Sequence, residues 1–126
     1  MKKQEERLQT AVSTYLKTQY PNVVFTSESS GIRVSMGVAV QMKRQRSKHK
    51  LPDLIILEPK GNFHGLCIEL KKNRKEIYLK DGSLSTKKHV QDQKNTLDLL
   101  ESKGYKAVFG CGFDEAKEII DNYMNQ

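Results

Sequence analysis

Two short segments in the middle of the chain each carry a carboxylate at a defined position. Asp53 follows a proline and opens the apolar run 54–57, and Glu69 lies sixteen residues later in a second strand-like run. The turn sequence 58–62 separates the runs, so we expect a β-hairpin. Side chains alternate across a strand, which places Glu69 and Lys71 on one face, about 6–7 Å apart.

The hairpin would bring together groups that suit phosphodiester chemistry. Asp53 and Glu69 supply oxygen ligands for a hard divalent cation, and the Lys71 ammonium lies beside them. Metal-assisted hydrolysis of a phosphodiester needs these groups. Pro-Asp and Glu-x-Lys strings are also common in ordinary strands, so neither string alone identifies a site.

The length and composition predict one domain over residues 1–126. A chain of 126 residues with 37% hydrophobic residues can bury a modest core. No apolar run approaches the ~20 residues of a membrane span. The N-terminal residues lead into no apolar signal core, so we expect a cytosolic protein without a targeting peptide. Cys67 and Cys111 lie in expected strands without metal-type spacing, which disfavours a zinc site.

The positive charge is clustered. The net charge is +7, and three basic groups account for much of it. The groups are Lys43, Arg44, Arg46, Lys48 and Lys50, then Lys71, Lys72, Arg74 and Lys75, and last Lys87, Lys88 and His89. Such clustering favours a polyanionic partner. Nucleic acid is favoured over a membrane surface, since no amphipathic helix carries this charge opposite a large apolar face.

The order of expected elements is α-β-(α)-β-β-α-β-α. We expect helices at 4–18, 38–46, about 90–103 and 113–124, strands at 23–25, 54–57, 63–70 and 107–109, a polar loop at 27–31, and a flexible stretch at 73–85 with a turn at Asp81-Gly82. A hairpin followed by a right-handed β-α-β crossover predicts a mixed sheet with helices on both sides.

Two polar residues fall where a core residue would be expected. Glu5 shares the inward stripe of the first helix with Leu8 and Val12, and Gln93 falls on the buried side of the second long helix. Buried polar groups are costly unless they are partnered, so both are candidate site residues. The simpler alternatives are that Glu5 enriches a first helical turn and that Gln93 is a boundary residue.

Taken together, these elements resemble the VRR-NUC family, the virus-type replication-repair nuclease branch of the PD-(D/E)xK superfamily. The chain has a glutamate on the first helix, Pro-Asp, Glu-x-Lys, and a glutamine eleven residues before a helix-ending Gly-Tyr. The resemblance covers nearly the whole chain and looks like the short, self-standing form carried by phages. Two features depart from the family: Lys50-Leu51 replaces the usual glycine before Pro-Asp, and the loop 71–84 is longer than usual.

The resemblance implies a fold and a metal site. The fold would be α/β, with a restriction-endonuclease-like core of order αβββαβ and a mixed β-sheet flanked by helices. Asp53 and Glu69 would bind Mg²⁺ or Mn²⁺, with the carbonyl of Leu70 as a further ligand. Glu5 would complete the site, directly or through a metal-bound water. An oxygen-only ligand set suits such a hard ion.

The resemblance also implies an activity. Lys71 would position or deprotonate the attacking water or stabilise charge on the phosphate, and Gln93 would orient a water or a phosphate oxygen. The substrate would be a four-way (Holliday) junction cut by a two-fold homodimer, in the cytoplasm of a bacterial or phage-infected cell. The Lys and Arg residues of the three basic groups other than Lys71 would contact DNA phosphates: Lys43, Arg44, Arg46, Lys48, Lys50, Lys72, Arg74, Lys75, Lys87 and Lys88.

Two other functions stay open at this point. One is a site-specific or nicking endonuclease of the same superfamily, which would cleave plain duplex at preferred sequences. The other is a basic DNA-binding module without catalysis, in which the acidic residues are structural. In the second case Glu69→Ala would leave the DNA function intact.

Overall fold

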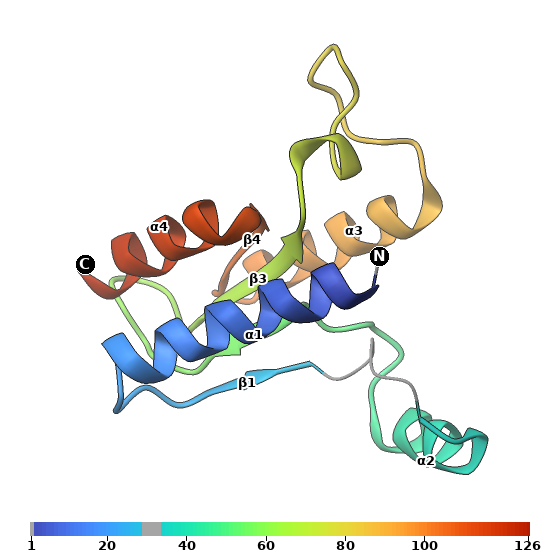
Figure 1. Cartoon of the computed structure of the whole chain (residues 1–126), viewed down its shortest axis with the longest axis horizontal. Helices are drawn as coiled ribbons and strands as arrows, with labels where there is room; N and C mark the ends of the chain where they lie inside the picture. The colour runs from blue at the N-terminus through green and yellow to red at the C-terminus, as the bar shows by residue number, and fades with distance from the viewer. Residues whose placement is uncertain (1, 29–33) are drawn as a thin grey trace.

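The computed structural model of the protein describes residues 2–28 and 34–126. In these ranges the elements follow the predicted order (Figure 1). They are α1 (Lys2–Gln19), β1 (Phe25–Ser27), α2 (Met36–Gln45), β2 (Leu54–Ile56), β3 (Leu66–Lys71), the 3₁₀ turn η1 (Arg74–Glu76), α3 (Lys88–Ser102), β4 (Lys106–Cys111) and α4 (Gly112–Met124). Residues 29–31 of the predicted polar loop lie outside the described residues.

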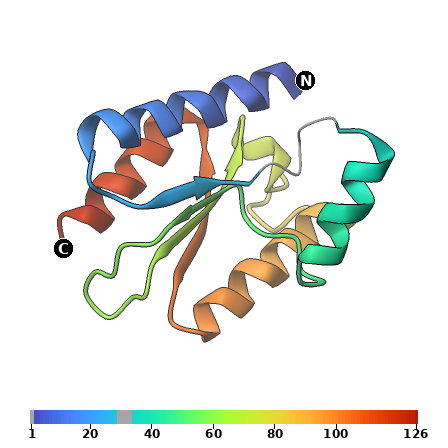
Figure 2. The same ribbon diagram turned by 90° about the horizontal axis from the view of Figure 1, so that it is seen from below.

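The strands form the predicted mixed sheet. Their order is β1-β2-β3-β4, with antiparallel pairing of β1 to β2 and of β2 to β3, and parallel pairing of β3 to β4. Helices α1 and α4 cover one face of this sheet, and α3 covers the other (Figure 2). The α/β class with a mixed sheet flanked by helices is therefore confirmed.

Alternation along the two central strands builds a core on each face. Leu54, Ile56, Leu66 and Ile68 pack with Val12, Leu16, Ala116 and Ile120 under α1 and α4. On the opposite face, Cys67 and Ala107 pack with Leu97 of α3. All six residues of β3 are buried, which is expected for a strand covered on both faces. Strand β3 is therefore well packed on both faces and can hold the residues at its C-terminal end in place.

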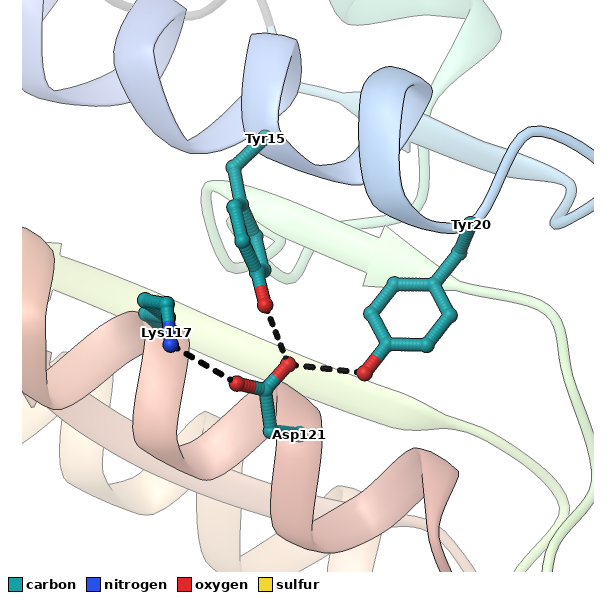
Figure 3. Close-up of polar contacts among 4 residues, drawn as sticks. All are labelled: Tyr15, Tyr20, Lys117 and Asp121. Carbon is teal, nitrogen blue, oxygen red and sulfur yellow. Dashed lines mark hydrogen bonds and ion pairs between the residues drawn. The ribbon is translucent and has the colours of Figure 1, made fainter.

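A polar cluster fastens α1 to α4 (Figure 3). The Asp121 Oδ1 atom accepts hydrogen bonds from the Tyr15 and Tyr20 hydroxyls at 2.5 and 2.7 Å, and Lys117 Nζ lies 3.1 Å from Oδ2. Burial opposes ionisation of Asp121, but the hydrogen bonds from both tyrosines and Lys117 outweigh burial and lower its pKa. The two helices on this face are thus joined by a charged carboxylate as well as by apolar contacts.

Several element boundaries differ from the prediction. Strand β1 begins at Phe25, because its pairing with Ile56 sets the register, and Val24 before it is 63% exposed. The stretch 73–85 contains η1 and a bridge between Tyr78 and Leu84, so it has more structure than predicted. The turn at Asp81-Gly82 is confirmed: Gly82 has φ 87°, and Ser83 N donates to Asp81 Oδ1. Over the described ranges, we find no helix with the length and apolarity to cross a membrane.

Candidate active site

The hairpin brings Asp53 and Glu69 together. Leu54 pairs with Ile68 in the antiparallel register of β2 and β3, so one step further places Asp53 opposite Glu69. Both residues are on the sheet face that α3 covers, because their neighbours Leu54 and Ile68 lie in the core under α1 and α4. Leu70 N donates to Asp53 Oδ2 at 2.8 Å, which fixes this carboxylate at the end of β3.

Glu69 is buried and partnered. Only 8% of the residue is exposed, and Gln93 Nε2 of α3 donates to Glu69 Oε2 at 3.0 Å. Burial raises the pKa of Glu69, and the charge of Asp53 and a hydrogen bond with Asp53 raise it further. In the absence of a cation, Glu69 therefore retains its proton well above the usual range for glutamate.

Lys71 shares the face of Glu69, as predicted from the strand alternation. It is 9% exposed, an unusual burial for a lysine. The positive charges of Lys71 and Lys50 act against the rise in the pKa of Glu69. The site thus combines two carboxylates with two nearby ammonium groups from different segments.

The backbone of Asp53 is held by contacts that the sequence did not reveal. Its carbonyl oxygen accepts from Glu28 N at 2.7 Å and from Gln9 Nε2 of α1 at 3.2 Å, and Gln9 also donates to the Glu28 carbonyl. The Pro52 side chain before it is fully buried. Gln9 is therefore a positioning residue that ties α1 to the start of β2. In the sequence, only the position of Gln9 one helical turn after Glu5 indicates that Gln9 faces the site.

The predicted inward position of Glu5 is wrong. Glu5 is exposed on the first turns of α1, whereas Leu8 is half-buried and Val12 is buried. In the part of the chain that the structure describes, no three His, Cys, Asp or Glu side chains gather closely enough to hold one metal ion. Glu5 lies one turn before Gln9, which contacts the Asp53 backbone.

The polar atoms around the pair fit a hydrated cation. The two carboxylates, and the Leu70 carbonyl expected as a further ligand, offer oxygen atoms only, which suits an ion that keeps several waters. Among the described residues, Gln93 Oε1 is a buried side-chain oxygen without a hydrogen-bond partner. A buried amide oxygen is stabilised by a donor, and a water on the cation would supply one. The donor set therefore fits Mg²⁺ or Mn²⁺.

The three basic groups lie on segments that adjoin the elements of the site. The first, 43–50, runs from α2 to the residues before Asp53, the second begins at the last residue of β3, and the third lies at the start of α3. Some of these cations form internal ion pairs: Arg46 with Glu28 at 2.9 Å, Lys72 with Glu76 at 4.0 Å, Arg74 with Glu115 at 3.6 Å and Lys88 with Asp92 at 2.8 Å. The Lys88–Asp92 pair is largely exposed, and such pairs contribute about 0–1 kcal/mol, so an external anion can compete for Lys88.

Comparison with known proteins points to one family. No protein-family model and no curated protein matches the chain. A solved structure described as a "VRR_NUC domain protein" matches 96% of this chain and 88% of its own, with 25% sequence identity and a TM-score of 0.64. The predicted resemblance to the VRR-NUC family is confirmed. Since nearly the whole chain matches, the VRR-NUC likeness includes α1, the hairpin and α3, the elements that carry the site.

Proposed function

We propose that this chain is a metal-dependent, structure-specific DNA endonuclease that cuts four-way junctions by phosphodiester hydrolysis. The observation that carries the proposal is the Asp53–Glu69 pair, with Lys71 on the same face and Gln93 bonded to Glu69. The likeness to a VRR-NUC domain protein supports a nuclease of the PD-(D/E)xK superfamily.

Asp53 and Glu69 would hold Mg²⁺ or Mn²⁺ together with the Leu70 carbonyl, and Glu5 would reach the ion through a water. The bound ion would polarise a phosphoryl oxygen and lower the pKa of a coordinated water. Because Glu69 retains a proton, cation binding requires that proton to leave. The hydrogen bond from Leu70 N to Asp53 keeps that carboxylate oriented through this change.

Lys71 and Gln93 would act on the substrate and the attacking water. The Lys71 ammonium is held in a low-dielectric position, where its charge stabilises negative charge on the phosphate more strongly than at an exposed surface. Gln93 keeps its Nε2 on Glu69, which leaves Oε1 to accept a hydrogen bond from a water and so orient it. Lys71 would position that water or take its proton.

The basic segments and α2 support the choice of a large, symmetric DNA substrate. Helix α2, which lies apart from the sheet in Figure 1, has no buried residue. Met36 and Val40 are exposed and lie one turn apart on one side of this helix. Such an exposed apolar pair suits contact with a second copy, and a two-fold homodimer would present two sites to the symmetric strands of a junction.

The test is a cleavage assay on labelled four-way junction, flap, duplex and single-stranded DNA, each with Mg²⁺, Mn²⁺ or EDTA. We expect paired nicks on the junction with either metal, none with EDTA, and none with Asp53→Asn. Cleavage of plain duplex at preferred sequences would contradict junction specificity. DNA binding without any metal-dependent cleavage would refute the nuclease.

A further inference from the structure

A cavity of about 360 Å³ lies beside the carboxylate pair. Residues 48–50 line one side, and residues of α3 from His89 to Leu99 line the other. The cavity shares Gln93 with the candidate active site, and Gln93 Nε2 is bonded to Glu69. Lys50, on the other side, precedes Asp53 by three residues. The cavity is therefore connected to the carboxylate pair through Gln93 and through the segment that leads into Asp53.

We propose that this cavity is the subsite for the deoxynucleotide that flanks the scissile phosphate. The inference rests on the proposed nuclease function and adds a substrate-positioning site that the carboxylates alone do not provide. The bound group would be a nucleoside phosphate, with its phosphate near Lys48 and Lys50 and its sugar and base along α3.

The charges of the cavity favour an anion. Lys48 and Lys50 contribute two ammonium groups from the segment that leads into Asp53. Asp92 is the acidic side chain in the lining, and its Oδ2 atom is paired with Lys88 Nζ at 2.8 Å. The field that a ligand meets is therefore positive, and the ligand's phosphate would be held within reach of two flexible donors.

The volume of the cavity and the α3 side chains that line it favour a nucleotide over a bare phosphate. Small-ligand pockets range from about 300 to 1,000 Å³, so this cavity suits one compact organic group. Asn95 offers an amide donor and acceptor for a base edge, and Leu99 offers an apolar surface. Thr96 Oγ1 donates to the Asp92 carbonyl at 3.2 Å, which leaves its oxygen as an acceptor. A free phosphate would make no use of the apolar surface of Leu99.

The experiment uses mononucleotides as probes of the full chain. ¹⁵N-labelled protein is titrated with a deoxynucleoside 5′-monophosphate, the 3′-monophosphate, the nucleoside and inorganic phosphate, with and without Mg²⁺. We expect the amide signals of residues 48–50 and 89–99 to shift with one of the monophosphates, and more weakly with the nucleoside or phosphate. Equal responses to phosphate and to monophosphate, or shifts elsewhere only, would overturn the nucleotide subsite.

Two exposed positions allow substitution without disturbing the core. Lys48→Gln and Asn95→Ala should each weaken monophosphate binding by about tenfold, the loss expected for one charge-assisted or buried hydrogen bond. Both should raise KM for DNA more than they lower kcat, and both should leave Mg²⁺ binding unchanged. Lys103→Gln, at the far end of α3, is the matched control and should change neither monophosphate binding nor the KM for DNA.

The two proposals fail in different ways. If the unmodified protein with Mg²⁺ cleaves no DNA, the nuclease is refuted, whatever the mononucleotides do. If it cleaves DNA but both variants bind monophosphate and DNA as the unmodified protein does, the subsite alone is refuted.

Discussion

Replacing Glu69 with glutamine should make the metal-free protein more stable at neutral pH while it abolishes metal-dependent activity. The reason is the proton that Glu69 retains beside Asp53. Burial first, and then the charge and hydrogen bond of Asp53, raise the pKa of Glu69 above its ordinary value of 4.5. Glutamine keeps the shape of the protonated side chain and can still accept from Gln93 and donate to Asp53.

The sign and size of the effect follow from proton linkage. Between pH 4.5 and the raised pKa, the folded protein holds a proton that the unfolded chain has lost. The contribution of Glu69 is fully present below pH 4.5, and it is lost as pH rises toward the folded pKa. The free energy of unfolding should therefore fall by up to about 1.4 kcal/mol per pH unit from this group. For a domain of this size, that is roughly 3–6 °C in Tm per unit.

The assay is urea unfolding of the metal-free protein, with EDTA present, at half-unit steps from about pH 5 to 7.5. As pH rises over this range, the free energy of unfolding of the unmodified protein should fall relative to that of Glu69→Gln. The difference between the two proteins should be smallest near pH 5. Glu118→Gln removes an exposed carboxylate of α4 and controls for the change in net charge. Parallel curves for the unmodified protein and Glu69→Gln would refute the raised pKa of Glu69.

Three further predictions test the fold and the site. Gly104→Ala should destabilise the protein by more than about 1 kcal/mol in urea unfolding. The reason is that Gly104 has φ 98° and that a Cβ there would lie 2.4 Å from His64 Cδ2. An unchanged urea midpoint would contradict this strain at residue 104. Asp121→Asn should lower the free energy of unfolding by about 1–3 kcal/mol, because it weakens the hydrogen bonds from Tyr15 and Tyr20 (Figure 3). This loss should shrink in acid as the carboxylate of the unmodified protein protonates. A loss that stays constant down to pH 3 would argue against a charged Asp121. DNA affinity should fall steeply with salt, with a log–log slope near −5 if about six phosphates are contacted, and a slope near zero would exclude the basic groups as the binding surface.

The sequence was sufficient to predict the centre of the molecule. The runs around Asp53 and Glu69 are short, apolar and separated by a turn, so few arrangements other than a hairpin bury them. The resulting pairing of the two carboxylates is confirmed by the register of Leu54 with Ile68. Gln93 was predicted on the buried side of its helix, and its bond to Glu69 agrees with that position.

The periphery was harder to predict, because there the apolar pattern no longer decides what is buried. Glu5 follows the spacing of Val12, yet it is exposed, since the first turns of α1 carry little of the core contact. In α2, Val38 and Val40 follow no buried stripe and are each 47% exposed. The contact of Gln9 with the Asp53 backbone depends on where α1 crosses the sheet, which no local pattern encodes.

The most direct test of the metal site is the anomalous diffraction of crystals grown with Mn²⁺. We predict one strong peak within coordination distance of both Asp53 and Glu69, lost in Glu69→Gln. Mn²⁺ bound elsewhere in the unmodified protein, with Asp53 and Glu69 still joined by their hydrogen bond, would contradict the site.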